Sequence, residues 1–377
     1  MNILKNNFEA ISPYSKEQVP DVIKSLKKDK DFHSSISTEL FPLVSRLFPR
    51  LGSFLFKQIF VSSFGESTTI DEFQNNLAPF VKKMVDKTTN GFTYSGIENL
   101  NTKPTLYISN HRDISLDPLF LNFARFLEGF KTVRIAVGDN LLDGGFFEKL
   151  MRLNKSFVVH RNIQGAKETL KKLSNLSSYI DHSIQSDKES IWIAQSEGRA
   201  IDGNDLTDPA VLKMLYLSNR KLLQVRDWVK SVNLTPISIS YEYDPLDITK
   251  AMSWDGWEEL SDEENNRKDL EEMVKGIKDP KGKVHLHICK RIEGNFSTIE
   301  ELAELIDKAI ISNYKLWPSN YIAAHTLDLI AKEENNFMNE EICFLERFKD
   351  LDIEVRKKAL EMYAAPLINS KQRSWTI

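Results

Sequence analysis

The chain has 377 residues, of which 41% are hydrophobic and 28% are charged. These proportions are close to those of globular proteins and argue against a fibrous or disordered chain. The length suits two compact domains or one large α/β domain with additions. A net charge of −4 argues against a nucleic-acid-binding protein that relies on a global excess of positive charge. Cys289 and Cys343 are far apart in the sequence, so we expect neither a disulfide framework nor a thiolate zinc site. We expect the protein in a reducing compartment such as the cytoplasm.

Membrane association is expected to be peripheral. No segment has the roughly 18 consecutive apolar residues that a spanning helix needs, and the N-terminal residues lack the apolar core of a signal peptide. The segment Leu40–Phe60 is rich in Phe and Leu but contains three cations and two prolines. Such a segment suits a helix lying in a bilayer interface, here on the cytoplasmic face; a loop and helix that cover a protein core are the alternative.

Residues 1–88 are predicted to form an N-terminal helical region. Apolar residues at spacings of three and four predict one helix that begins near Thr69 or Asp71, and Pro79 inside it predicts a kink or a break. The apolar positions are Ile70, Phe73, Leu77, Phe80, Val81 and Met84.

Residues 89–297 are predicted to form an α/β domain, because strand-like apolar runs alternate with helix-like segments. This alternation indicates βαβ units around a mostly parallel sheet flanked by helices. Asp117 and Asp208 each precede a proline, and both are expected to cap a helix. The expected strands include a short one near FTYS (92–95) and runs at 105–109, 133–137, 156–160, 190–194, 236–241 and 284–289; the expected helices are 118–127, 145–153, 166–184 and 209–217.

Two further regions complete the predicted organisation. The charged residues 254–283 predict a loop or helical insertion. Residues 298–377 predict a C-terminal helical region, with Ile342, Leu345, Phe348 and Leu351 as one apolar stripe.

Common catalytic signatures are absent: the sequence has no GxSxG, GxGxxG, GxxxxGK[ST] or HExxH motif. The triplet His111-Arg112-Asp113 resembles the start of a kinase catalytic loop, but Pro118 stands where that loop needs Asn. His111 follows an expected strand and has carboxylates at Asp113 and Asp117. Since ligands bind beyond the carboxyl ends of strands in open parallel sheets, His111 is a candidate site residue.

Two other expected strands end in candidate binding residues. One ends in His160 and Arg161, and another runs into Glu197, Gly198 and Arg199. Arginine has a fork of donors that suits phosphate, and glycine lets the backbone approach a ligand closely. The three strand ends together therefore predict a site at one edge of the sheet.

Four segments in this order resemble the conserved blocks of the glycerolipid acyltransferases. ISNHRDISLDP is similar to the first block, SFVVHR to the second, IWIAQSEGRAIDGND to the third and LTPISISYE to the fourth. The resemblance covers about Phe92 to Tyr243. Two departures stand out: five residues rather than four separate His111 from Asp117, and no residue stands between Gly198 and Arg199.

The resemblance implies transfer of a fatty acyl group from an acyl thioester to a hydroxyl of glycerol-3-phosphate or 1-acylglycerol-3-phosphate, as in phospholipid biosynthesis. His111 would be the general base. Asp117 would orient its imidazole, with Asp113 as the alternative partner. The co-substrate would be acyl-CoA or an acyl-carrier protein, and neither a cofactor nor a metal is expected.

The resemblance also implies how the phosphorylated glycerol acceptor would bind. Arg161 and Arg199, with His160, would hold its phosphate and position its hydroxyl. Glu197 would orient an arginine or bind a second hydroxyl, and Gly198 would let the backbone come close.

Other functions remain open at this point. The acceptor could be another lipid or an amine. A lipid hydrolase or transacylase could use Ser109 or Ser115 as its nucleophile. A protein that binds lipid or phosphate without catalysis could retain the same scaffold.

Overall fold

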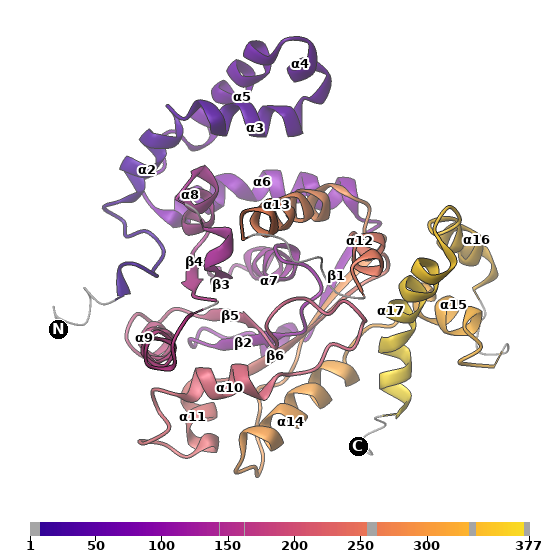
Figure 1. Cartoon of the computed structure of the whole chain (residues 1–377). Coiled ribbons are helices and arrows are strands. Elements are labelled where there is room, and N and C mark those ends of the chain that lie inside the picture. The colour runs from indigo at the N-terminus through magenta and orange to yellow at the C-terminus, as the bar shows by residue number, and fades with distance from the viewer. Residues whose placement is uncertain (1–7, 143, 162, 255–261, 332–336, 373–377) are drawn as a thin grey trace. The chain divides into compact units, whose positions relative to one another are not determined.

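The structure, a computed structural model, describes residues 8–142, 144–161, 163–254, 262–331 and 337–372 (Figure 1). The chain forms two compact units. The first consists of Met1–Lys83 and Arg134–Ile163, and the second of Met84–Val133 and Gln164–Ile377. These boundaries differ from those of the three predicted regions, whose status as domains stays a prediction.

The first unit is mainly helical and is built around phenylalanine. Phe32, Phe56 and Phe60 are buried, and the ring of Phe32 meets the other two edge-on at 5.2 and 5.1 Å. The strands of this unit pair in parallel. Its elements are α2 (Val19–Leu26), α3 (Lys30–Leu40), α4 (Pro42–Leu47), α5 (Pro49–Phe64), most of α6 (Ile70–Thr88), β3 (Arg134–Gly138), the 3₁₀ turn η2 (Asp139–Leu141), α8 (Phe146–Leu153) and β4 (Ser156–Val159).

Prolines act in two ways in this unit. Pro42 and Pro49 stand at the first positions of α4 and α5, where a missing N–H costs nothing and the fixed φ favours the helix. Pro79 lies inside α6, which nevertheless continues from Ile70 to Thr88. The predicted break is therefore absent. Packing of the apolar face, for example Phe64 against Phe73 and Phe80, accompanies the continued helix.

The second unit contains a five-stranded sheet in the order β1-β7-β6-β2-β5. All neighbouring strands are parallel except β6 and β7, which are antiparallel. This arrangement confirms the predicted mostly parallel sheet flanked by helices. The strands are β1 (Phe92–Ser95), β2 (Leu106–Ser109), β5 (Ile191–Ala194), β6 (Thr235–Tyr241) and β7 (Val284–Ile288).

Helices cover both faces of this sheet (Figure 1). Successive side chains of a strand point to opposite faces. On β6, Tyr241 contacts Phe120 of α7, whereas Ser240 accepts a hydrogen bond from Trp317. The helical elements are η1 (Ile97–Asn99), α7 (Leu116–Leu127), α9 (Ala166–Gln185), α10 (Pro209–Tyr216), α11 (Val225–Ser231), α12 (Asp247–Met252), α13 (Asp262–Lys278), α14 (Ile299–Ser312), α15 (Pro318–Thr326), α16 (Met338–Glu346) and α17 (Ile353–Gln372).

The predicted insertion at 254–283 contains the helix α13. Its residues 255–261 lie outside the described chain.

Of the two predicted helix caps, one is confirmed and one is wrong. Asp208 caps α10 by accepting from the backbone N of Ala210, as predicted. Asp117 does not cap α7, because that helix already begins at Leu116.

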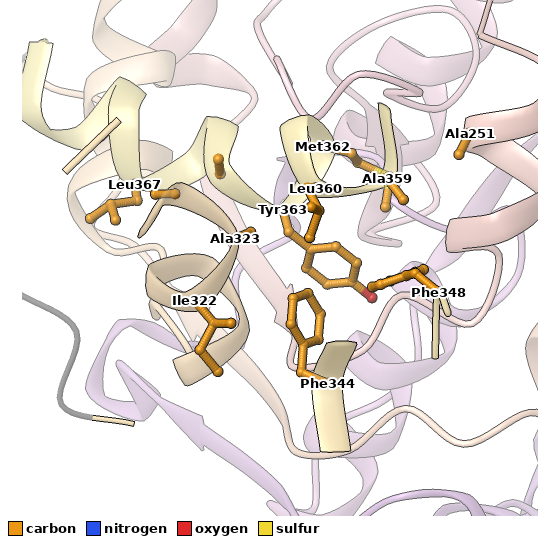
Figure 2. Packing of buried hydrophobic residues seen from close by; sticks show 12 residues of the cluster. Ala251, Ile322, Ala323, Phe344, Phe348, Ala359, Leu360, Met362, Tyr363 and Leu367 are labelled. Carbon is orange, nitrogen blue, oxygen red and sulfur yellow. The ribbon is translucent and has the colours of Figure 1, made fainter. Parts of the chain in front are cut away.

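The C-terminal helices share a core with α12 (Figure 2). The ring of Tyr363 contacts Phe344 and Phe348. The predicted apolar stripe was partly wrong: Phe348 is buried, but Ile342 is 74% exposed and Phe344 is buried in its place. The hydroxyl of Tyr363 accepts from the backbone N of Asp244 and donates to Asp247, which ties α17 to the segment after β6.

Candidate active site

The loop between β2 and α7 holds His111 in a fixed position. Asn110 exchanges two hydrogen bonds of 2.9 Å with the backbone of Ile239 on the neighbouring strand. Asp205 accepts from the backbone N of His111 at 3.1 Å and from the side chains of Asn110 and Gln195. The start of the loop is therefore fixed from two sides by groups that are themselves part of the sheet or its edge.

His111 and Asp117 form a buried pair. The distance from His111 Nδ1 to Asp117 Oδ2 is 3.0 Å, and the imidazole meets the ring of Trp192 edge-on at 5.9 Å. An ionised carboxylate can only accept, so Nδ1 carries the proton in this bond and Nε2 is left to accept one. Among the described residues, no hydrogen bond engages Nε2. This is the geometry of a general base with an orienting carboxylate.

Asp117 also organises the loop around the imidazole. Its Oδ2 accepts from the backbone N–H groups of Arg112 and Asp113 at 2.7 and 3.0 Å, and its Oδ1 accepts from the hydroxyl of Tyr241 at 2.7 Å. The loop closes over the carboxylate, which accommodates the additional residue between His111 and Asp117. Burial, and then the charge of Asp117, raise the pKa of Tyr241 well above its ordinary value, so this tyrosine stays a donor.

Asp113, the alternative partner, has a different task. Its Oδ1 accepts from the backbone N–H groups of Ser115 and Leu116 at 2.9 Å each. Asp113 therefore supplies the helix cap that was predicted for Asp117. Its Oδ2 is buried without a partner among the described residues. Burial, and then the nearby charge of Asp117, raise the pKa of Asp113.

The predicted residues of the third segment lie beside the His111 loop, since the backbone N of Ala200 donates to the carbonyl of His111 at 3.0 Å. Gly198 has a φ of +80°, and a Cβ there would meet open space. Gly198 thus forms a left-handed turn, and the close approach of a ligand to its backbone stays a prediction. The side chain of Glu197 is exposed. Arg199 is paired with Glu272 of α13 at 2.5 Å.

His160 and Arg161 lie in the first unit. His160 Nδ1 is 2.9 Å from Asp139 Oδ2, and the backbone N of Arg161 donates to Asp139 Oδ1 at 3.0 Å. A Cβ on Gly138 would come within 2.7 Å of Arg161 Nε. The glycine therefore leaves space for the guanidinium to lie across the end of β3.

A buried cluster of charged residues, Arg112, Asp244 and Lys250, contacts the backbone of the His111 loop. Lys250 donates to Asp244 and to the carbonyl of Arg112, both at 2.6 Å, and Arg112 lies 3.5 Å from Asp244. Burial disfavours the ionised form of Asp244, but Lys250 and Arg112 outweigh it and lower the pKa of that carboxyl. Sequence reasoning missed this cluster, and it also missed Asp139, Asp205, Tyr241 and Glu272.

Comparison with known proteins identifies the class. Residues 91–209 match the family model described as Acyltransferase, and this range includes the His111 loop, His160 with Arg161, and Arg199. Residues 91–209 therefore form an acyltransferase-family domain. The match supports the resemblance of its segments to the glycerolipid acyltransferases.

The crystal structure of the 1-acyl-sn-glycerophosphate acyltransferase from Thermotoga maritima is similar with a TM-score of 0.39 and 16% sequence identity, over 75% of this chain and 95% of that one. No curated protein matches the chain significantly in sequence.

Proposed function

We propose that this acyltransferase moves a fatty acyl group from an acyl thioester to a hydroxyl of glycerol-3-phosphate or 1-acylglycerol-3-phosphate, in phospholipid biosynthesis. The observation that carries the proposal is the buried His111–Asp117 pair inside the matched domain. An alcohol is a poor nucleophile, and a positioned general base is the usual way to activate it.

In the proposed reaction His111 takes up one proton and later releases it, whereas Asp117 transfers none. Nε2 of His111 removes the proton from the acceptor hydroxyl while the hydroxyl oxygen attacks the thioester carbonyl carbon. The tetrahedral intermediate then breaks its C–S bond, and the departing thiolate of coenzyme A or of the carrier protein takes that proton from the imidazolium. Asp117 keeps the proton on Nδ1 and stabilises the imidazolium cation throughout.

We assign Arg161 as the main arginine that binds the acceptor phosphate, with His160 beside it. Its guanidinium lies over Gly138, and its backbone is held by Asp139. Arginine suits this task because its fork of donors matches phosphate oxygens. The role of Arg199 depends on α13, because its guanidinium is paired with Glu272 of that helix.

A serine-dependent reaction receives less support. Ser109 donates to the carbonyl of Asn110 at 2.7 Å and accepts from Trp192 at 3.0 Å, in a fully buried position. The hydroxyl of Ser115 donates to Asp113. A serine nucleophile needs its hydroxyl within reach of a general base, but these two hydroxyls donate to the carbonyl of Asn110 and to Asp113 and not to His111.

The acceptor can be identified directly. Purified protein should be incubated with a labelled acyl thioester and either glycerol-3-phosphate, 1-acylglycerol-3-phosphate, a lysophospholipid or an amine, and the labelled lipids then separated. The proposal expects product with one of the first two acceptors. Product with only the lysophospholipid or the amine would replace the proposed acceptor.

The proposed membrane contact is an apolar patch that runs from the last residue of α3 through α4 to the first half of α5. Residues spaced three and four apart on α5 form two faces. Phe56, Phe60 and Phe64 face the core, and the opposite face is exposed. The patch consists of Leu40, Leu43, Leu47, Phe48, Leu51, Phe54 and Leu55, all exposed.

Exposed cations Arg46, Arg50 and Lys57 accompany the apolar patch. Apolar side chains beside cations suit the surface of an anionic bilayer. Among the helices that the structure describes, none is both long and apolar enough to cross a membrane. From the apolar patch and its cations we infer peripheral contact, on the cytoplasmic face. Phe56, expected from the sequence to be part of the contact, is excluded from it because its ring is buried.

Replacing Leu47 and Phe54 together by serine should release the protein from anionic phosphatidylglycerol vesicles. Each side chain contributes about 1.5–3 kcal/mol when fully buried, so binding should weaken by at least about tenfold, as measured by co-sedimentation. Leu222→Ser is the matched control, since Leu222 is 78% exposed outside the patch. Unchanged binding of the double variant would show that the patch is not the contact.

A further inference from the structure

One face of α13 covers the part of the candidate site that contains Arg199. Asp269, Glu272 and Gly276 recur at intervals of three and four and therefore lie on the same face of the helix. Glu272 Oε2 is 2.5 Å from Arg199 Nη2, and Asp269 Oδ1 is 3.7 Å from the same nitrogen. Gly276 faces Asp113 so closely that a Cβ would come within 2.4 Å of Asp113 Oδ2.

The charge around Arg199 does not favour a phosphate in this arrangement. Two carboxylates already face its guanidinium, and the carboxylate of Asp113 also acts on it. A phosphate dianion placed there would meet an excess of negative charge at close range, and like charges at such distances oppose one another strongly. The guanidinium of Arg199 and the carboxyl of Glu272 are both largely buried, so solvent screens them little.

The ion pair of Arg199 and Glu272 also leaves one carboxylate oxygen of Glu272 unsatisfied within the described chain. Glu272 Oε1 is buried and has no hydrogen-bond partner among the described residues. A buried carboxylate with one unsatisfied oxygen is costly, and a purely structural ion pair would be expected to satisfy both oxygens. A carboxylate and a phosphate present similar oxygen geometry to arginine. Glu272 thus occupies the position on Arg199 that an acceptor phosphate would take.

We infer that Glu272 is a specificity-determining residue that competes with the acceptor's phosphate for Arg199. This inference rests on the proposed function. The phosphate binds Arg199 by replacing Glu272, so that α13 sets how tightly a phosphorylated acceptor is held. An acceptor without a phosphate lacks the group that can make this exchange.

The test is the binding of inorganic phosphate, measured by isothermal titration calorimetry. Glu272→Gln keeps the shape of the side chain and removes its charge. It should tighten phosphate binding by about 10- to 10³-fold, since a neighbouring charge shifts a proton equilibrium by about 1–3 units. Glu271→Gln is the matched control, because Glu271 is exposed on the same helix and pairs with Arg267 instead. It should leave phosphate affinity unchanged.

Two more variants keep the inference open to refutation. The gain should vanish in the double variant Glu272→Gln with Arg199→Ala, because it requires the guanidinium. Asp269→Asn, at a more exposed position, should give a smaller gain and provides a result if Glu272→Gln is unstable. Equal or weaker phosphate binding in both charge-removing variants, or a gain that persists without Arg199, would overturn the inference.

The same proteins distinguish this inference from the proposed function. If wild-type protein transfers no acyl group to a glycerol phosphate, the proposed function fails, whatever the calorimetry shows. If transfer occurs but neither Glu272→Gln nor Asp269→Asn changes phosphate affinity, the proposed function stands and the role of Glu272 is refuted.

Discussion

Replacing His111 by alanine is expected to lower the turnover number for acyl transfer by about 10²–10⁴-fold, the usual contribution of a positioned general base. The imidazole is the group that would take the hydroxyl proton, and within the described part of the chain only its Nδ1 is hydrogen-bonded, to Asp117. The measurement is the initial rate of labelled lipid formation at saturating thioester and acceptor.

The fold should survive this substitution. The position of the loop depends on backbone and side-chain bonds of Asn110, Asp205 and Asp117, and circular dichroism should be unchanged. His182→Ala is a suitable control, because His182 lies 3.4 Å from Asp187 at the end of α9 and is outside the site. Turnover near the wild-type rate in His111→Ala would remove His111 from the mechanism.

Asp117→Asn should be nearly as inactive as His111→Ala, whereas Asp113→Asn should keep substantial activity. An asparagine at 117 can direct its oxygen toward His111 Nδ1 and the two backbone donors, and its NH₂ toward the hydroxyl of Tyr241, which can also accept. The geometry is then kept and the negative charge that stabilises the imidazolium is lost. We expect a loss of about 10²–10⁴-fold in turnover with little change in melting temperature.

Asp113→Asn is the matched comparison because it removes a carboxylate from the same loop. The asparagine oxygen can still accept from Ser115 and Leu116, so the start of α7 is retained. Both variants should be compared by initial rate and by thermal unfolding. The reverse ranking, with Asp113→Asn the less active, would mean that Asp113 assists His111 and that the contact with Asp117 is structural.

The fold was largely predictable because its pattern is periodic. Short apolar runs such as those around β2 and β5 are bounded by polar loops, and the helices between them carry apolar faces. The prediction failed where packing outweighed a local signal. Pro79 does not interrupt α6. Ile342 is exposed although its spacing suggested burial, because Phe344 fills the core instead.

The site was predictable only to the extent that its residues follow strand ends. His111 and Asp117 could be found in this way, since they lie in one short loop. Asp205 and Tyr241 lie in the segments that resemble the third and fourth blocks, but nothing local indicates that their side chains reach the His111 loop. Glu272 comes from a helix more than 70 residues after Arg199 in the chain (|i−j| = 73), and such a long-range ion pair leaves no pattern in a single sequence.

The most direct test of the central claim is a time course of turnover with labelled acyl thioester and each glycerol phosphate acceptor, followed by mass spectrometry of lipids and of the intact protein. The account predicts that label passes to the acceptor's hydroxyl, that no acyl group accumulates on the protein, and that His111→Ala slows this transfer. Label that accumulates on the protein, or that appears only as free fatty acid, would contradict direct transfer by the His111–Asp117 pair.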